Sequence, residues 1–182
     1  MCVGILSLIL TACINKTPLL DDENGQPLTR AQMLGEASHW SMKGKLGLKS
    51  PDENLNLGVW WTQEGEAYQI DFRGAMAIGS GRISGDPEKG TSLEANGDPP
   101  VFGRSPEQLV KKLTGVSIPV SPMKYWVRGL PAPGSNWEGN ADRFQQMGWL
   151  VEVLPDSRGL PQRILLTRQD VRLKLIVKSW GY

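Results

Sequence analysis

The residue with the clearest chemical potential is Cys13, which ends a short apolar segment near the N-terminus. Residues 3–9 are mostly apolar, and Leu10, Thr11 and Ala12 lead directly to the cysteine thiol. A short apolar segment engages an export machinery, small residues suit a peptidase that cuts before the cysteine, and a thiol can carry an acyl chain. The spacing therefore predicts export, cleavage before Cys13 and lipid attachment to its sulfur.

The same pattern divides the chain into three parts. We expect residues 1–12 to be a signal peptide, and residues 13–30 to be the lipidated cysteine followed by a flexible tether. Residues 31–182 are long enough for a single domain with one core. The alternative for residues 3–12 is a short buried helix or strand, which would make Cys13 an ordinary buried thiol. This apolar run is much shorter than the roughly 20 residues that span a bilayer.

Other chemistries find little support in the composition. The chain has 20 Lys and Arg against 19 Asp and Glu, which argues against nucleic acid as a partner. His39 is the only histidine and no G-x-S-x-G elbow is present, so a Ser-His-Asp triad has little basis. With Cys2 removed by cleavage and Cys13 lipidated, no thiol is left for a disulfide or a metal site. A hydrolase built on two carboxylates stays open, but the sequence favours a non-enzymatic protein without metal or cofactor.

Alternation between apolar and polar residues predicts a mainly β domain. Residues 55–61 and 68–72 alternate on either side of a turn at residues 64–66, which predicts a hairpin with one apolar face. Three more stretches near the C-terminus repeat the pattern: residues 149–153, 164–166 and 171–177. One apolar and one solvated face are typical of a curved antiparallel sheet.

Two short helices are expected between these strands. Ser105 can cap a helix that begins at Pro106 and stops at Gly115. Ser121 is expected to start a second helix that ends near Gly129. Each helix has one apolar side, which must cover something apolar. A sheet curled into an incomplete barrel provides such a surface, with the helices as its lid or plug.

The segment that contains these helices resembles a known family. Residues 113–119 read LTGVSIP and residues 126–131 read WVRGLP, which is similar to the LTG-x-x-IP and W-x-x-GLP signature of the LolB family of outer-membrane lipoproteins. Weaker similarities extend the resemblance over residues 13–182, at residues 43–46, 60–63 and 173–180. The helical block is the most specific part of the match.

The resemblance implies both a fold and a function. The fold is an incompletely closed antiparallel β-barrel with short helices over a hydrophobic cavity. The cavity accepts the acyl chains of lipoproteins from a LolA-like periplasmic carrier, and the lipoproteins are then inserted into the outer membrane. Because each buried methylene contributes about 0.8 kcal/mol, long acyl chains need a direct handover between cavities. We expect a monomer on the periplasmic side of the outer membrane, anchored through acylated Cys13.

Candidate residues for the cavity are apolar positions on the expected strands and helices. They are Leu57, Val59, Trp61, Ile70, Phe72, Leu109, Leu113, Trp126, Leu173 and Leu175. Plain core packing explains each of them equally well. In that case the chain would be a lipid-anchored structural or envelope-assembly protein without a lipid-accepting cavity.

The resemblance also singles out Ile78. In the family, a loop between two early strands exposes an apolar residue that puts lipoproteins into the membrane, and Ile78 occupies that place here. The Asn and Pro of the family loop are replaced by Met76 and Ala77, while Gly79 still permits a tight exposed loop. The alternative is that Ile78 is the first core residue of the next strand.

Basic residues are frequent toward the C-terminus. Those that could meet lipid phosphates are Arg163, Arg168, Arg172, Lys174 and Lys178. A solvated outer face of the sheet is the simpler explanation for them.

Overall fold

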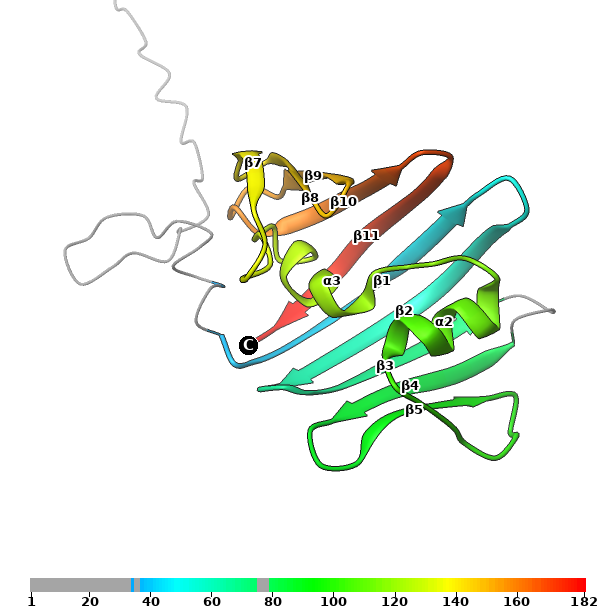
Figure 1. Ribbon diagram of the computed structural model, residues 1–182. Coiled ribbons are helices and arrows are strands. Elements are labelled where there is room, and N and C mark those ends of the chain that lie inside the picture. The colour runs from blue at the N-terminus through cyan, green and yellow to red at the C-terminus, as the bar shows by residue number, and fades with distance from the viewer. Residues whose placement is uncertain (1–33, 35–36, 75–78) are drawn as a thin grey trace, which may run out of the picture.

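One antiparallel sheet forms the body of the protein (Figure 1). The computed structural model describes residue 34 and residues 37–74 and 79–182. Within them the strands are β1 (His39–Lys49), β2 (Asn54–Glu64), β3 (Ala67–Gly74), β4 (Ser80–Asp86), β5 (Gly90–Ala95), β6 (Val101–Gly103), β7 (Trp137–Asn140), β8 (Arg143–Gln146), β9 (Trp149–Pro155), β10 (Pro161–Arg168) and β11 (Val171–Gly181). Their order is β6-β5-β4-β3-β2-β1-β11-β10-β9-β8-β7, so β6 and β7 are the edges of a barrel that is not closed.

The sheet is joined in its middle by the first and last strands. β1 pairs with β11 and with β2, both antiparallel, and its register shifts at Lys43 and Gly44. Inward-facing residues meet across these pairs, as in Met42 opposite Trp61 and Leu46 opposite both Leu57 and Leu175. Cross-strand apolar pairs of this kind fix the register, because a one-residue slip would turn each strand's apolar face to water.

Two helices lie over one face of this sheet, as the sequence led us to expect (Figure 1). α2 (Pro106–Thr114) begins after Ser105, whose hydroxyl accepts a hydrogen bond from the backbone N–H of Gln108, and it ends at Gly115 with φ of 72°. Glycine adopts a positive φ at little cost in free energy, so Gly115 can end the helix. No helix within the described residues is long and apolar enough to cross a membrane.

The second helix, α3 (Val120–Trp126), starts differently from the sequence-based expectation. Pro119 is its cap residue, and no side chain caps the helix. Ser121 lies inside the first turn, where its backbone N–H donates to the Glu107 side chain of α2. The backbone N–H of Ser121, which has no acceptor within α3, is therefore satisfied by the neighbouring helix and not by a serine hydroxyl. We call residues 106–126, which contain both helices, the lid.

The hairpin β4–β5 was not predicted from alternation. Two positions on its inward face are Gly81 and Gly85, and a Cβ atom there would lie 2.6 Å from the ring of Phe72 and 2.0 Å from that of Tyr68. Aromatic rings of β3 thus occupy the space that side chains of β4 would fill. For this reason β4 does not show the alternation of apolar and polar residues, although it is a strand of the sheet.

Candidate acyl-chain cavity

An apolar cavity of about 80 Å³ lies between the sheet and the lid. Its walls come from the inward faces of β1, β2, β3, β4 and β11, from both helices and from the loop between them. The lining residues are Met42, Leu46, Leu48, Leu57, Val59, Trp61, Ile70, Phe72, Ile83, Val110, Leu113, Thr114, Ile118, Val120, Met123 and Leu175. The cavity therefore depends on the lid as much as on the sheet.

The lining offers hydrocarbon almost exclusively. Thr114 is its one hydroxyl-bearing residue, and that hydroxyl donates to the carbonyl of Val110 at 2.9 Å and accepts from the N–H of Val116 at 3.2 Å. Its polar atom is thus satisfied within the chain. A wall of this kind suits an aliphatic ligand, since a polar ligand would lose its hydrogen bonds to water without replacement.

Seven of the ten residues proposed from the sequence line this cavity: Leu57, Val59, Trp61, Ile70, Phe72, Leu113 and Leu175. The other three are buried elsewhere in the core. Trp126 packs against Trp149 with ring centroids 6.5 Å apart, and Leu109 lies over Gly103. Leu173 pairs with Leu48 and Leu166 in the sheet. Contact of the ten residues with an acyl chain stays a prediction.

Several lining residues were not among the sequence candidates. Met42, Leu46 and Leu48 lie on β1, where the alternation that begins at Trp40 is a readable signal. Val120 and Met123 come from α3 and face the sheet. Seven residues are too short a helix for an apolar period to show which side is covered.

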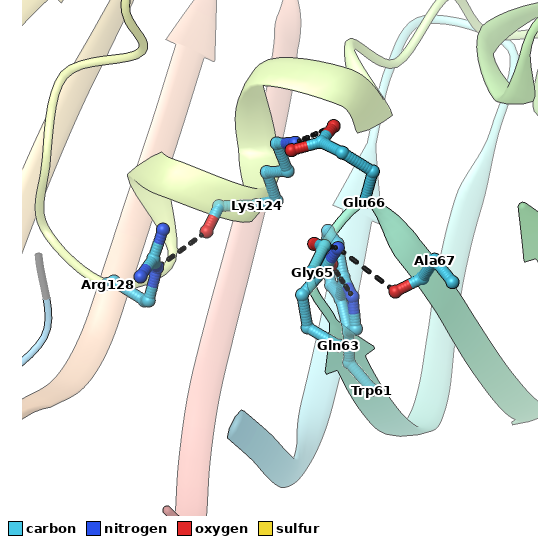
Figure 2. A network of polar contacts seen from close by, with 7 residues as sticks. All are labelled: Trp61, Gln63, Gly65, Glu66, Ala67, Lys124 and Arg128. Atoms are coloured by element: carbon cyan, nitrogen blue, oxygen red, sulfur yellow. Dashed lines mark hydrogen bonds and ion pairs between the residues drawn. The ribbon is translucent and has the colours of Figure 1, made fainter. Parts of the chain in front are cut away.

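The C-terminal end of the lid is attached to the sheet at the β2–β3 turn (Figure 2). Lys124 of α3 donates to the carboxylate of Glu66 at 2.7 Å, and the Glu66 side chain is 73% exposed. The turn itself is braced by the buried Gln63, which accepts from the Trp61 indole at 3.1 Å and donates to the carbonyl of Gly65 at 2.8 Å. A rigid turn therefore presents a solvent-exposed ion pair to the lid.

The two helices are linked by Glu107 of α2. Its carboxylate accepts a 2.7 Å hydrogen bond from the backbone N–H of Ser121 in α3. Burial, the largest single effect, would raise the pKa of Glu107, but hydrogen bonds from Ser121, from its own backbone and from Ser105 together lower it. The ionised carboxylate is thus the form that holds the helices together.

The same end of the lid is also held by buried polar groups. Arg128, 4% exposed, donates from Nε to the carbonyl of Lys124 at 2.9 Å and from Nη1 to the carbonyl of Leu34. Its guanidinium lies 5.5 Å from the Trp40 ring, and burial lowers its pKa. No carboxylate within the described residues forms an ion pair with it. Carbonyl and ring contacts therefore compensate this buried charge.

A second buried network lies beside it. Gln146 of β8 accepts from the Trp126 indole at 2.7 Å and from the N–H of Ala132 at 2.8 Å, and it donates to the carbonyl of Ala132. Gln146 is 2% exposed. The C-terminal end of the lid is thus held both by buried hydrogen bonds and by one ion pair whose carboxylate is exposed.

Comparison with known proteins agrees with this architecture. The family model for the outer membrane lipoprotein LolB matches residues 38–180, which include the whole lid and all of the sheet except Gly181. The chain belongs to the LolB family. The outer-membrane lipoprotein LolB of Alkalilimnicola ehrlichii is 31% identical to this chain, over 98% of the chain and 94% of the relative. Those of Stutzerimonas stutzeri and Pseudomonas aeruginosa LESB58 are each 34% identical, over 96% and 84% of the chain and 91% and 78% of the relatives.

LolB membership confirms the resemblance drawn from residues 113–131. The open sheet with two covering helices also confirms the expected fold of an incompletely closed antiparallel β-barrel. Cys13 and Ile78 lie outside the described residues. Lipidation at the first and membrane insertion by the second stay predictions.

Proposed function

We propose that the chain is an outer-membrane lipoprotein that accepts other lipoproteins through their acyl chains and releases them into the outer membrane. The observation that carries this function is the cavity beneath the lid, whose lining residues are apolar apart from Thr114, the hydroxyl of which is hydrogen-bonded within the chain. Relatives that share the whole chain are named outer-membrane lipoprotein LolB. The activity is reception and transfer, and no catalytic step is needed.

The size of the cavity implies that the lid moves when cargo enters. Pockets for ligands of drug size measure about 300–1,000 Å³, whereas this cavity measures about 80 Å³. An acyl chain therefore enters only when the lid rises from the sheet. The ion pair between Lys124 and Glu66 is exposed and contributes no more than about 1 kcal/mol. The contacts of Arg128 and Gln146 at the C-terminal end of α3 are buried and much harder to break, so we expect the lid to keep them and to pivot about them.

The partners follow from the same chemistry. Acyl chains would expose apolar area in the periplasm, so we propose that a LolA-like carrier delivers them by direct contact, with this chain as a monomer. Each methylene that leaves the carrier is buried again here. Anchoring through acylated Cys13 would hold the receptor beside the membrane that receives the cargo.

Handover from a loaded carrier tests the proposal. The full chain with Cys13→Ser is mixed with a LolA-like carrier that holds a radiolabelled lipoprotein, and the complexes are separated by affinity tag. We expect an equimolar complex of this chain with the lipoprotein. The same cargo without its acyl chains is the control and should not be captured. Absence of transfer, or equal capture of the unacylated cargo, would contradict the proposal and favour a structural role.

Delivery is proposed to depend on Ile78. An exposed apolar side chain in that loop would enter the membrane surface while the cavity empties. Ile78→Glu should leave folding and cargo capture intact and block transfer into vesicles. The control is Val101→Glu, a change at an exposed apolar residue of the edge strand β6. Loss of cargo capture in Ile78→Glu would instead indicate a core position.

A further inference from the structure

The face of the sheet opposite the lid, which we call the outer face, is strongly basic at its centre. Strands β10, β11 and β1 are neighbours in the sheet, and their sequences contain no Asp or Glu. The exposed cations at the outward-facing positions of these strands are Lys43, Lys45, Lys49, Arg163, Arg172, Lys174 and Lys178. Within the described part of the chain, no carboxylate forms an ion pair with any of these seven.

Large apolar side chains are exposed among these cations. Register places Leu154 opposite Arg163, Arg163 opposite Ile176, and Ile176 opposite Lys45. Leu154 is 44% exposed and Ile176 is 37% exposed. Apolar and basic residues therefore alternate along one row that crosses the outer face from β9 to β1.

Trp60 extends this surface onto β2. It is 48% exposed, and the ammonium group of Lys43 lies 4.1 Å from its ring centroid. A groove of about 820 Å³ passes beside it, with Lys45, Arg73 and Lys178 in its wall. The acidic residues of this groove are Asp71, which lies opposite Trp60 in the register and is paired with Arg82 at 2.8 Å, and Glu94 and Asp98.

We propose that this outer face docks on the anionic phospholipid surface of the membrane. Cations interspersed with a tryptophan and exposed aliphatic side chains match the composition of surfaces that lie in a lipid headgroup layer. Each Lys or Arg near an anionic bilayer adds to the attraction within a Debye length. This docking goes beyond the proposed function, because it orients the receiving state: the lid and the cavity face an arriving carrier, and release into the bilayer is a separate, later step.

Vesicle binding with a matched pair of variants tests the docking. The full chain with Cys13→Ser is titrated with vesicles of phosphatidylcholine alone or mixed with phosphatidylglycerol, at low and high salt. One variant carries Lys45→Gln, Lys174→Gln and Lys178→Gln. The control carries Lys89→Gln, Lys111→Gln and Lys112→Gln, which are exposed lysines away from the outer face. Both variants lose the same net charge, and neutral vesicles report any contribution of the apolar residues 3–12.

We expect the outer-face variant to partition on the order of a hundredfold more weakly onto anionic vesicles at low salt. The control should stay close to the parent, and high salt should remove the difference. The proposal would be overturned if both variants lost the same vesicle affinity, or if phosphatidylglycerol did not increase the binding of the parent. It would also be overturned by an outer-face variant that binds vesicles normally but no longer engages the carrier, since the face would then be a protein contact. Cargo capture from the carrier should persist in the outer-face variant, which separates this test from that of the cavity.

Discussion

Lys124 in α3 and Glu66 in the β2–β3 turn lie 58 positions apart in the sequence, and their side chains form a 2.7 Å ion pair at the C-terminal end of the lid (Figure 2). The carboxylate is exposed, whereas the Lys124 side chain is only 18% exposed. This contact is weak enough to break during function. At the same end of α3, Arg128 and Gln146 hold the helix through buried hydrogen bonds.

Breaking this ion pair should open the lid more often. An exposed pair contributes up to about 1 kcal/mol, so Glu66→Gln should speed the uptake of a fluorescent fatty acid up to about fivefold. The measurement is stopped-flow fluorescence at low salt. Glu64→Gln is the matched control, since Glu64 is exposed in the same turn region. Equal rates in both variants would contradict a role of the pair in the lid.

Filling the cavity should weaken acyl-chain binding. Leu57→Trp adds bulk at a lining position and should lower the affinity for a fluorescent fatty acid at least about tenfold. Leu55→Trp is the control, because Leu55 is also half-buried on the inward side of β2 but does not line the cavity. The affinities come from equilibrium titration. Similar losses in both variants would place the ligand elsewhere.

Removing the Arg128 guanidinium should destabilise the fold. Arg128→Met leaves the carbonyls of Leu34 and Lys124 without their donor, at a cost of about 2–3 kcal/mol in the free energy of unfolding. Urea denaturation followed by tryptophan fluorescence measures this cost. Arg163→Met, at an exposed position, should change stability by less than about 0.5 kcal/mol. A small effect at Arg128 would mean that water or other groups replace its hydrogen bonds.

The contact between α2 and α3 should weaken in acid. The pKa of Glu107 is lower in the folded protein than in the unfolded chain, so its stabilisation is present above the unfolded pKa, near about 4.3, and is lost as the pH falls through the folded pKa. The stability gap between the parent and Glu107→Gln should therefore shrink below about pH 4. Chemical denaturation across pH measures the gap.

A shorter carboxylate side chain at position 107 provides the control for that prediction. Glu107→Asp keeps a titratable carboxylate but shortens the side chain, so it should not reach the N–H of Ser121. We expect Glu107→Asp to be destabilised at neutral pH much as Glu107→Gln is. Full stability in Glu107→Asp would show that the charge at this position matters and the hydrogen bond does not.

Much of the fold follows from local patterns. Alternation in β2, β3, β9, β10 and β11 predicts their inward faces, because side chains on a strand point to opposite sides in turn. Ser105, Pro106 and Gly115 predict α2, because each satisfies a backbone requirement of a helix end. The spacing of residues 113–131 was enough to indicate the family.

Other features depend on packing between distant segments. β4 has no apolar period, because rings from β3 fill the space over Gly81 and Gly85. The start of α3 depends on a carboxylate from α2. The prediction that Ser121 starts this helix was therefore wrong. Local preference is a weak signal wherever a neighbouring element supplies the missing contact.

The sequence by itself determined that Cys13 ends an apolar segment suited to lipidation, that the domain is an antiparallel sheet with two helices, and that the chain resembles LolB. The tertiary structure decided which apolar residues surround a cavity, because Met42 of β1 and Met123 of α3 meet there only after the lid folds over the sheet. It also decided that the basic residues of β10, β11 and β1 form one surface. Periodicity shows which residues of one strand share a face. Only strand order and register show which faces of different strands form one surface.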